Sequence, residues 1–146
     1  MKRKWGRNIR VGEATMSCIP SFKVVRSRLK TVKINGRSKI DNSYDEIIEV
    51  VKLLLRGTEV DEKWYLSKYP DVAEAVDAGA LKSGRHHFIE VGYFEGRRPR
   101  DFEVDEKWYT ETYPDVAKSL GKKAIESARQ HFNEHGYDEG RLPAEW

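Results

Sequence analysis

Four histidines are the residues of this 146-residue chain best suited to bind a metal ion. His131 and His135 are four residues apart, which places them on one face of a helix, and His86 and His87 are adjacent. No carboxylate or thiol completes the set at ligand spacing, and an earlier segment of similar sequence has Val91 at the position of His135. We therefore expect no metal site. His87 and His131 are instead expected to be buried and hydrogen-bonded to a neighbouring turn.

Covalent and acid–base catalysis have no support in the sequence. Cys18 is the single cysteine, so it cannot form a disulfide within the chain, and no nearby histidine or helix N-terminus would acidify its thiol. The sequence has no glycine-rich phosphate loop, no Ser-His-Asp arrangement and no paired-carboxylate motif. We predict no catalytic residues and no cofactor, and we expect that the chain is not an enzyme.

Two arginines recur in the same tripeptide and have the geometry to bind an anion. They are Arg97 in Glu95-Gly96-Arg97 and Arg141 in Glu139-Gly140-Arg141. A guanidinium holds a carboxylate or a phosphate through two parallel hydrogen bonds. An ion pair with Asp71 or Asp115 explains the recurrence as well as a ligand does, and we favour that structural role.

Two aromatic pairs, Trp64-Tyr65 and Trp108-Tyr109, could stack on sugar rings or peptides. Packing in the core is the favoured role, because stacked repeats need an aromatic anchor at the same place in each unit. If Trp64 and Trp108 are core anchors, replacing either of them by alanine should lower the folding stability by about 3 to 5 kcal/mol.

All these groups lie in two copies of one segment, residues 60–99 and 104–143, which align without a gap at an offset of 44 residues. The copies share Val-Asp-Glu-Lys-Trp-Tyr, Tyr-Pro-Asp-Val-Ala, His-Phe, Gly-Tyr, Glu-Gly-Arg and a closing proline. A period of this length marks a repeated supersecondary unit.

Residues that start and end helices recur in each repeat and predict three short helices per repeat. In the first repeat these residues are as follows. Asp61 caps the first helix, which ends at Tyr69 because a residue before proline resists the α-helical region. Pro70 starts the second helix and Ser83 caps the third. Gly92 is expected to end the third helix in a left-handed turn.

Two local signals lie ahead of the repeats. Asn35-Gly36 stands between two short β-branched runs and predicts a hairpin near residues 31–40. Ser43 and Glu46 form a capping box at the start of a helix that Gly57 ends.

The expected fold is mainly α, with a tandem repeat of short helices preceded by one longer helix, a basic N-terminal arm and a small β-hairpin. The expected domains are the arm with its hairpin, residues 1–42, and a helical domain, residues 43–146, which contains the lead-in helix 43–57 and both repeats.

The repeat motifs resemble a short module found in many bacterial proteins. The resemblance rests on Asp-x-x-Trp-Tyr-x-x-x-Tyr-Pro-Asp-Val-Ala, then His-Phe, then Gly-Tyr-x-Glu-Gly-Arg-x-Pro, and it covers both repeats but not residues 1–42. That module is seen beside or within surface-polysaccharide glycosyltransferases and in hemolysin-type proteins. The resemblance implies a helical, non-catalytic module and carries over no catalytic residues.

Charge is divided unevenly along the chain. Residues 1–40 carry twelve basic side chains and one acidic side chain, whereas the rest carries 15 basic and 23 acidic side chains. An arm of formal charge +11 can bind nucleic acid, an acidic membrane surface, an acidic polymer or the protein's own acidic repeats. The residues expected to bind an anion or a partner are Lys2, Arg3, Lys4, Arg7, Arg10, Lys23, Arg26, Arg28, Lys30, Lys33, Arg37 and Lys39.

These features predict a cytoplasmic protein without a transmembrane segment, because the most apolar run is short and broken by Glu49 and Lys52. The expected function is a non-catalytic binding or scaffolding module with a protein partner, accessory to bacterial surface-polysaccharide or envelope assembly. The alternative is a nucleic-acid-associated protein that binds phosphates through its basic arm. Between these, the apolar residues Phe22, Val24, Val25, Leu29, Val32 and Ile34 favour an arm that packs rather than an extended polycation.

Overall fold

The computed structural model describes residues 19–145. This part of the chain is mainly α-helical and contains one two-stranded antiparallel hairpin, which confirms the predicted fold class. The chain divides into two compact units, Met1–Thr58 and Glu59–Trp146. Five of the cations assigned to the basic arm lie outside the described residues, as does Cys18; they are Lys2, Arg3, Lys4, Arg7 and Arg10.

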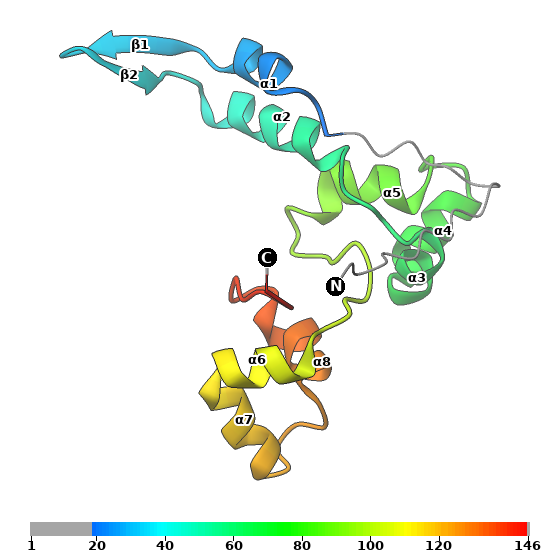
Figure 1. Cartoon of the computed structure of the whole chain (residues 1–146). Helices are drawn as coiled ribbons and strands as arrows, with labels where there is room; N and C mark the ends of the chain where they lie inside the picture. Colours follow the sequence, from blue (N-terminus) through cyan, green and yellow to red (C-terminus); the bar gives the residue numbers. More distant parts are fainter. Residues whose placement is uncertain (1–18, 146) are drawn as a thin grey trace, which may run out of the picture. The chain divides into compact units, whose positions relative to one another are not determined.

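The first unit contains two helices and the hairpin (Figure 1). Its elements are α1 (Phe22–Arg28), β1 (Thr31–Ile34), β2 (Arg37–Ile40) and α2 (Tyr44–Leu55). Helix α1 packs against α2 and was not predicted from the sequence. Val25 of α1 and Leu29, which directly follows this helix, are partly buried, so packing overrides the weak helix propensity of this valine-containing run.

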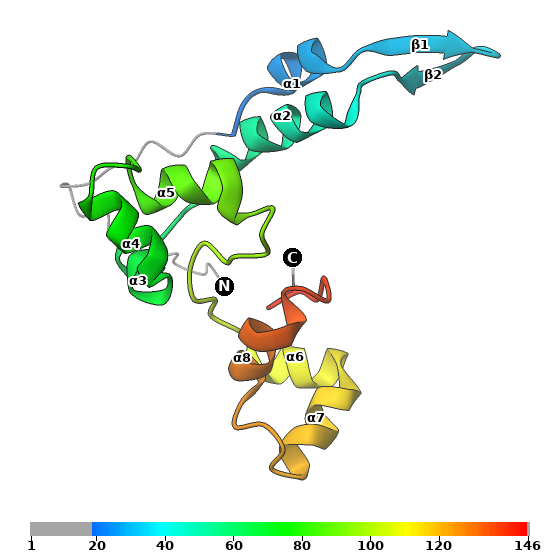
Figure 2. The ribbon, with the colours of Figure 1, turned by 180° about the vertical axis from the view of Figure 1, so that it is seen from behind.

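The hairpin forms where the Asn-Gly pair predicted it. Asn35 and Gly36 both have positive φ, 51° and 75°, as a tight two-residue hairpin turn requires. Strand β1 pairs with β2 in the register Thr31 to Ile40 and Ile34 to Arg37. The ribbon extends away from the helix pair in both views of the chain (Figures 1 and 2).

The capping box at the start of α2 is also confirmed. The Ser43 hydroxyl accepts a hydrogen bond from the Glu46 amide at 3.3 Å, and the Ser43 amide donates to the Glu46 carboxylate at 3.0 Å. Asn42, just before the cap, ties the base of the hairpin to α1 by accepting from the Lys30 amide at 2.7 Å and donating to the Arg28 carbonyl at 3.0 Å. Helix α2 belongs to the first compact unit, which extends to Thr58. The domain boundary after Asn42 stays a prediction.

The second unit contains both repeats, each built from two helices and a third that ends in a π-helical turn. The first repeat has α3 (Glu62–Lys68), α4 (Pro70–Asp77), α5 (Gly84–His87) and the turn Phe88–Gly92, and the second has α6 (Glu106–Thr112), α7 (Pro114–Gly121), α8 (Ala128–His131) and the turn Phe132–Gly136. No helix of the described residues is long and apolar enough to span a bilayer.

The predicted helix starts are present in both repeats. In the first repeat, Asp61 accepts from the Trp64 amide at 2.9 Å, Pro70 occupies the first turn of α4, and Ser83 accepts from the His86 amide at 3.0 Å. The predicted left-handed turn at Gly92 is wrong. Gly92 lies within the π-helical turn, and the glycine that follows this turn with positive φ is Gly96, at 75°.

Two sets of hydrogen bonds join distant parts of each repeat. In the first, the Asp61 amide donates to the Pro99 carbonyl at 3.1 Å, which joins the two ends of the repeat. The Glu62 carboxylate accepts from the Gly84 and Arg85 amides at 2.6 and 2.9 Å, so a residue of α3 caps α5. The second repeat reproduces both sets with Asp105, Pro143 and Glu106.

The segment between the repeats is docked on the second of them. The Asn133 side chain accepts from the Phe102 amide at 2.9 Å and donates to the Phe102 carbonyl at 3.0 Å. The Phe102 ring stacks on Tyr137, with centroids 5.2 Å apart. The first repeat has Ile89 in place of Asn133, so this clamp belongs to the second repeat alone.

Candidate functional site

The recurring tyrosine and histidine form a hydrogen-bonded pair in each repeat, in which the tyrosine is buried and the histidine is buried in the first repeat and partly buried in the second. The Tyr65 hydroxyl is hydrogen-bonded to His87 Nδ1 at 3.0 Å, and that of Tyr109 to His131 Nδ1 at 3.1 Å. Both tyrosines are 0% exposed. Burial raises the pKa of Tyr65, and it raises the pKa of Tyr109 to about 12, so neither phenol ionises near neutral pH. The pair therefore has a structural role in packing. The sequence predicted that each histidine would be hydrogen-bonded to a neighbouring turn, whereas the observed partner is a tyrosine hydroxyl.

Acid should destabilise the repeats through these histidines. Burial lowers the pKa of His87 and of His131 below the ordinary value of 6.5, so the folded repeats bind fewer protons than the unfolded chain. The free energy of unfolding should therefore have its full value when the pH is above the histidine pKa of the unfolded chain. It should decrease as the pH falls from about 7 to 5. Urea titrations at several pH values measure this decrease. Glutamine at both positions should flatten it, and an equally steep decrease in that variant would refute the assignment.

The two Glu-Gly-Arg arginines are paired within their own repeats, as predicted. Arg97 donates from Nη1 and Nη2 to the two carboxylate oxygens of Asp71 at 3.0 and 2.8 Å, and its guanidinium lies 4.9 Å from the ring centre of Tyr69. Arg141 repeats this arrangement with Asp115. The Arg97 hydrogen bonds lower the pKa of Asp71. These guanidiniums hold the last turn of each repeat against its second helix.

The recurring tryptophans lie at the edge of the core, and Trp108 packs against its buried residues. Trp64 and Trp108 are half-buried, whereas the adjacent tyrosines and the repeated Phe88 and Phe132 lie in the core. Tyr65 and Tyr109 do not contribute to a surface. Truncation of the fully buried tyrosines is therefore expected to lose the most stability, and the cost predicted for the tryptophans stays a prediction.

The described residues contain no group of three or more histidine, cysteine, aspartate or glutamate side chains arranged to hold a metal ion. His131 and His135 do lie together, with ring centroids 5.7 Å apart. A hollow in the first unit has a volume of about 370 Å³ and is lined by residues of mixed charge. Its lining comprises Arg28, Glu46, Glu49, Val50, Leu53 and Arg56.

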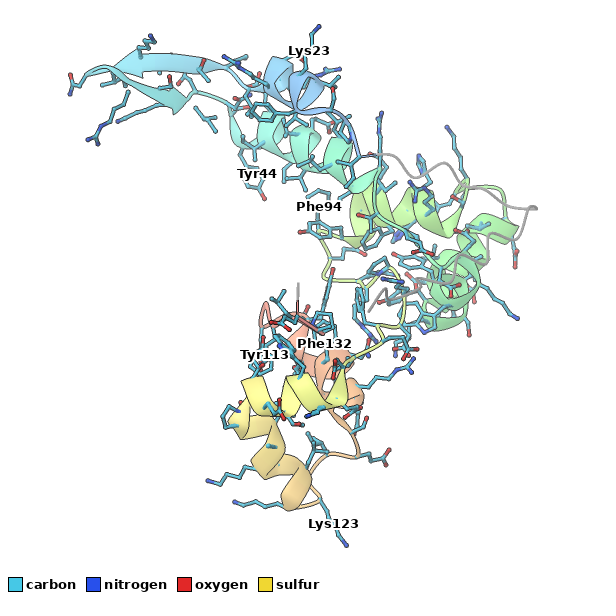
Figure 3. All side chains as sticks on the ribbon, viewed as in Figure 1. Lys23, Tyr44, Phe94, Tyr113, Lys123 and Phe132 are labelled. Atoms are coloured by element: carbon cyan, nitrogen blue, oxygen red, sulfur yellow. The ribbon has the colours of Figure 1, made fainter. Side chains whose placement is uncertain are left out.

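Most of the described basic side chains of the first unit lack an ion-pair partner among the described residues. Six of its basic side chains make no ion pair with any described residue, and we call them the basic face: Lys23, Arg26, Arg28, Lys33, Arg37 and Lys39. Lys30 differs, because it pairs with Glu46. Residues 19–40 contain no acidic side chain. Figure 3 shows the Lys23 side chain pointing away from the ribbon.

The arginines of the repeats show the opposite behaviour. Arg98 and Arg129 both pair with Asp101, Arg100 pairs with Glu59, and Arg97 and Arg141 pair as described above. These arginines are thus neutralised internally, whereas the cations of the basic face and exposed repeat lysines such as Lys63 and Lys118 make no ion pair with a described residue.

Large apolar side chains lie beside the basic face. Phe22 is 74% exposed, Ile40 58% and Ile34 45%, and Val24 and Val32 are exposed as well. Val25 and Leu29 are partly buried, whereas these other apolar residues of the arm are exposed within the chain itself. That a partner covers them stays a prediction. A surface that combines unpaired cations with exposed apolar groups is the strongest candidate for a binding site in the described residues.

Comparison with known proteins gave no match: no family model, curated protein or solved structure is similar to the chain. The resemblance to the bacterial repeat module stays a prediction.

Proposed function

We propose that the protein is a non-catalytic binding module in which the two repeats serve as the scaffold and the first unit contacts the partner. The basic face is the single observation that carries this proposal. Its six cations have no described counter-charge, and a partner that supplies negative charge would neutralise them.

The sparse core of the first unit supports the same assignment. Within its described residues, only Val50 and Leu55 are buried hydrophobic side chains, and all eight strand residues of the hairpin are exposed. An isolated two-stranded hairpin is marginally stable in water. Contact with a partner would bury exposed apolar groups such as Ile34 and Ile40 and stabilise the ribbon.

A protein partner in bacterial surface-polysaccharide or envelope assembly is the setting that the repeat resemblance suggests. The repeats suit a scaffold because hydrogen bonds within each repeat pair its Glu-Gly-Arg arginine, the N-terminus of its third helix and its two ends. Nucleic acid is the second candidate partner. It is favoured by residues 19–40, which carry seven cations and no acidic side chain.

Copurification from the native cell tests the proposal. A triple variant of the hairpin, Lys33→Ser with Arg37→Ser and Lys39→Ser, should lose the partner that the natural chain retains. The matched control removes the same charge from exposed repeat lysines through Lys63→Ser, Lys118→Ser and Lys122→Ser, and it should retain the partner. Equal recovery with both triple variants would reject the basic face as the contact surface.

A further inference from the structure

We propose that the β1–β2 hairpin inserts into the major groove of duplex DNA while the cations of α1 contact the flanking phosphates. This inference rests on the proposed function, because it names the partner of the same basic face. It favours the second candidate partner over a protein, for the geometric reasons below.

The register sorts the hairpin side chains into two faces, and both are cationic. Because side chains alternate along a strand and directly opposed residues share a face, Thr31, Lys33, Ser38 and Ile40 lie on one face. The other face carries Val32, Ile34, Arg37 and Lys39.

The first face has the chemistry to read base edges. The hydroxyls of Thr31 and Ser38 donate and accept hydrogen bonds, the Lys33 ammonium donates to purine acceptors, and Ile40 offers an apolar contact for a thymine methyl group. Lys33 and Ser38 are directly opposed in the register, so their polar groups lie side by side.

The dimensions of the ribbon also match the groove. The major groove of B-DNA is about 12 Å wide and admits a two-stranded ribbon. Strands of four residues at about 3.3 Å per residue span roughly 13 Å, or about four base-pair steps. The ribbon extends away from the helices (Figure 1), and the hydrogen bonds of Asn42 fix its base to α1.

A membrane surface fits these faces less well. Val32 lies opposite Lys39, and Ile34 lies opposite Arg37, so the apolar side chains of that face are each flanked by a cation. Shallow insertion into a bilayer requires an apolar face separated from the charged one. A groove bounded by two phosphate backbones, by contrast, accommodates cations on both faces of a ribbon.

Binding of the full chain to a 20-base-pair duplex, measured by fluorescence anisotropy between 50 and 200 mM salt, tests the inference. Affinity should decrease steeply with salt, because each neutralised phosphate releases counterions. The hairpin triple variant should bind about 10- to 100-fold more weakly at low salt, and its salt slope should be smaller by about 3. The repeat-lysine control should bind like the natural chain.

Duplex RNA and anionic vesicles identify the mode of contact. The major groove of A-form RNA is too narrow for side chains to read, so an RNA duplex of the same sequence should bind more weakly than DNA. Equal binding to duplex RNA, or tighter binding to phosphatidylserine vesicles than to DNA, would overturn groove insertion.

Chemical footprinting of the natural chain does not depend on any variant folding correctly. The bound protein should protect guanine N7, which lies in the major groove, from methylation by dimethyl sulfate, and should leave adenine N3 in the minor groove reactive. The reverse pattern would overturn the inference. If the chain fails to bind DNA but the hairpin variant still loses its partner in copurification, the groove inference fails and the proposed function stands.

Discussion

Replacing Tyr65 by alanine should lower the free energy of unfolding of the repeats by about 3 to 5 kcal/mol. The side chain is 0% exposed, and its ring contacts Tyr69 and Phe88, at centroid distances of 4.7 and 6.0 Å. Its removal leaves a cavity and deprives His87 Nδ1 of its hydrogen-bond partner. Tyr109→Ala should have a similar effect, because its contacts are the same in the second repeat.

Urea unfolding followed by circular dichroism measures this loss, and two further variants resolve its origin. Tyr65→Phe keeps the ring and removes only the hydroxyl, so it should cost about 1 to 3 kcal/mol. Tyr44→Ala is the exposed control, since that side chain is 77% exposed, and it should change stability by no more than about 0.5 kcal/mol. If Tyr65→Ala were no more destabilising than the control, the core described here would be incorrect.

Replacing Gly92 by alanine should cost about 3 kcal/mol, because the added methyl group has no room. A Cβ atom at Gly92 would overlap the Tyr65 hydroxyl oxygen and lie 3.1 Å from His87 Nδ1. Both of these atoms belong to buried side chains that are already hydrogen-bonded to one another, so neither can move without breaking that bond. Gly136→Ala should destabilise the second repeat for the same reason, through overlap with the Tyr109 hydroxyl.

Gly121 provides the matched control for this prediction. It lies at the end of α7 with an ordinary negative φ, and a Cβ atom there would have nothing within 4 Å. Gly121→Ala should therefore stabilise the protein by about 0.5 to 1 kcal/mol, the difference in helix propensity. Thermal melts of the three variants suffice for the comparison, and a neutral Gly92→Ala would contradict the close approach of Tyr65.

Local chemistry explains which parts of the fold could be predicted from the sequence. The caps at Ser43, Asp61 and Ser83 and the hairpin turn at Asn35 depend on residues within three positions of each other, so their geometry follows from residue type and spacing. The ion pair of Arg97 with Asp71 spans 26 residues, but the recurrence of both residues in each repeat restricted the choices.

Features set by tertiary packing could not be predicted in the same way. The sequence does not say which aromatic of Trp64-Tyr65 faces inwards, because that depends on the rotation of α3 against α5. The same rotation brings the Glu62 carboxylate to the N-terminus of α5 and the Tyr65 hydroxyl to Gly92. The available sequence signal was that Glu62 and Gly92 recur in the second repeat at the same sequence separation from the tyrosine.

For the candidate site, the sequence located the cations but not the state of the apolar residues between them. Runs such as Val32 to Ile34 alternate in a way that predicts a strand, yet only the structure shows that both faces of the resulting ribbon are exposed. The unpaired state of Arg28 and Arg37 likewise depends on where acidic side chains lie in space.

Hydrogen exchange of the full chain, alone and with the partner recovered by copurification, tests most directly the claim that the repeats are the scaffold and the first unit binds. Without partner, amides of the repeats should be protected, and those of the exposed β1–β2 hairpin should exchange rapidly. With partner, protection should increase over residues 22–40 and remain unchanged in residues 60–143. New protection confined to the repeats, with the hairpin still exchanging rapidly, would contradict the account.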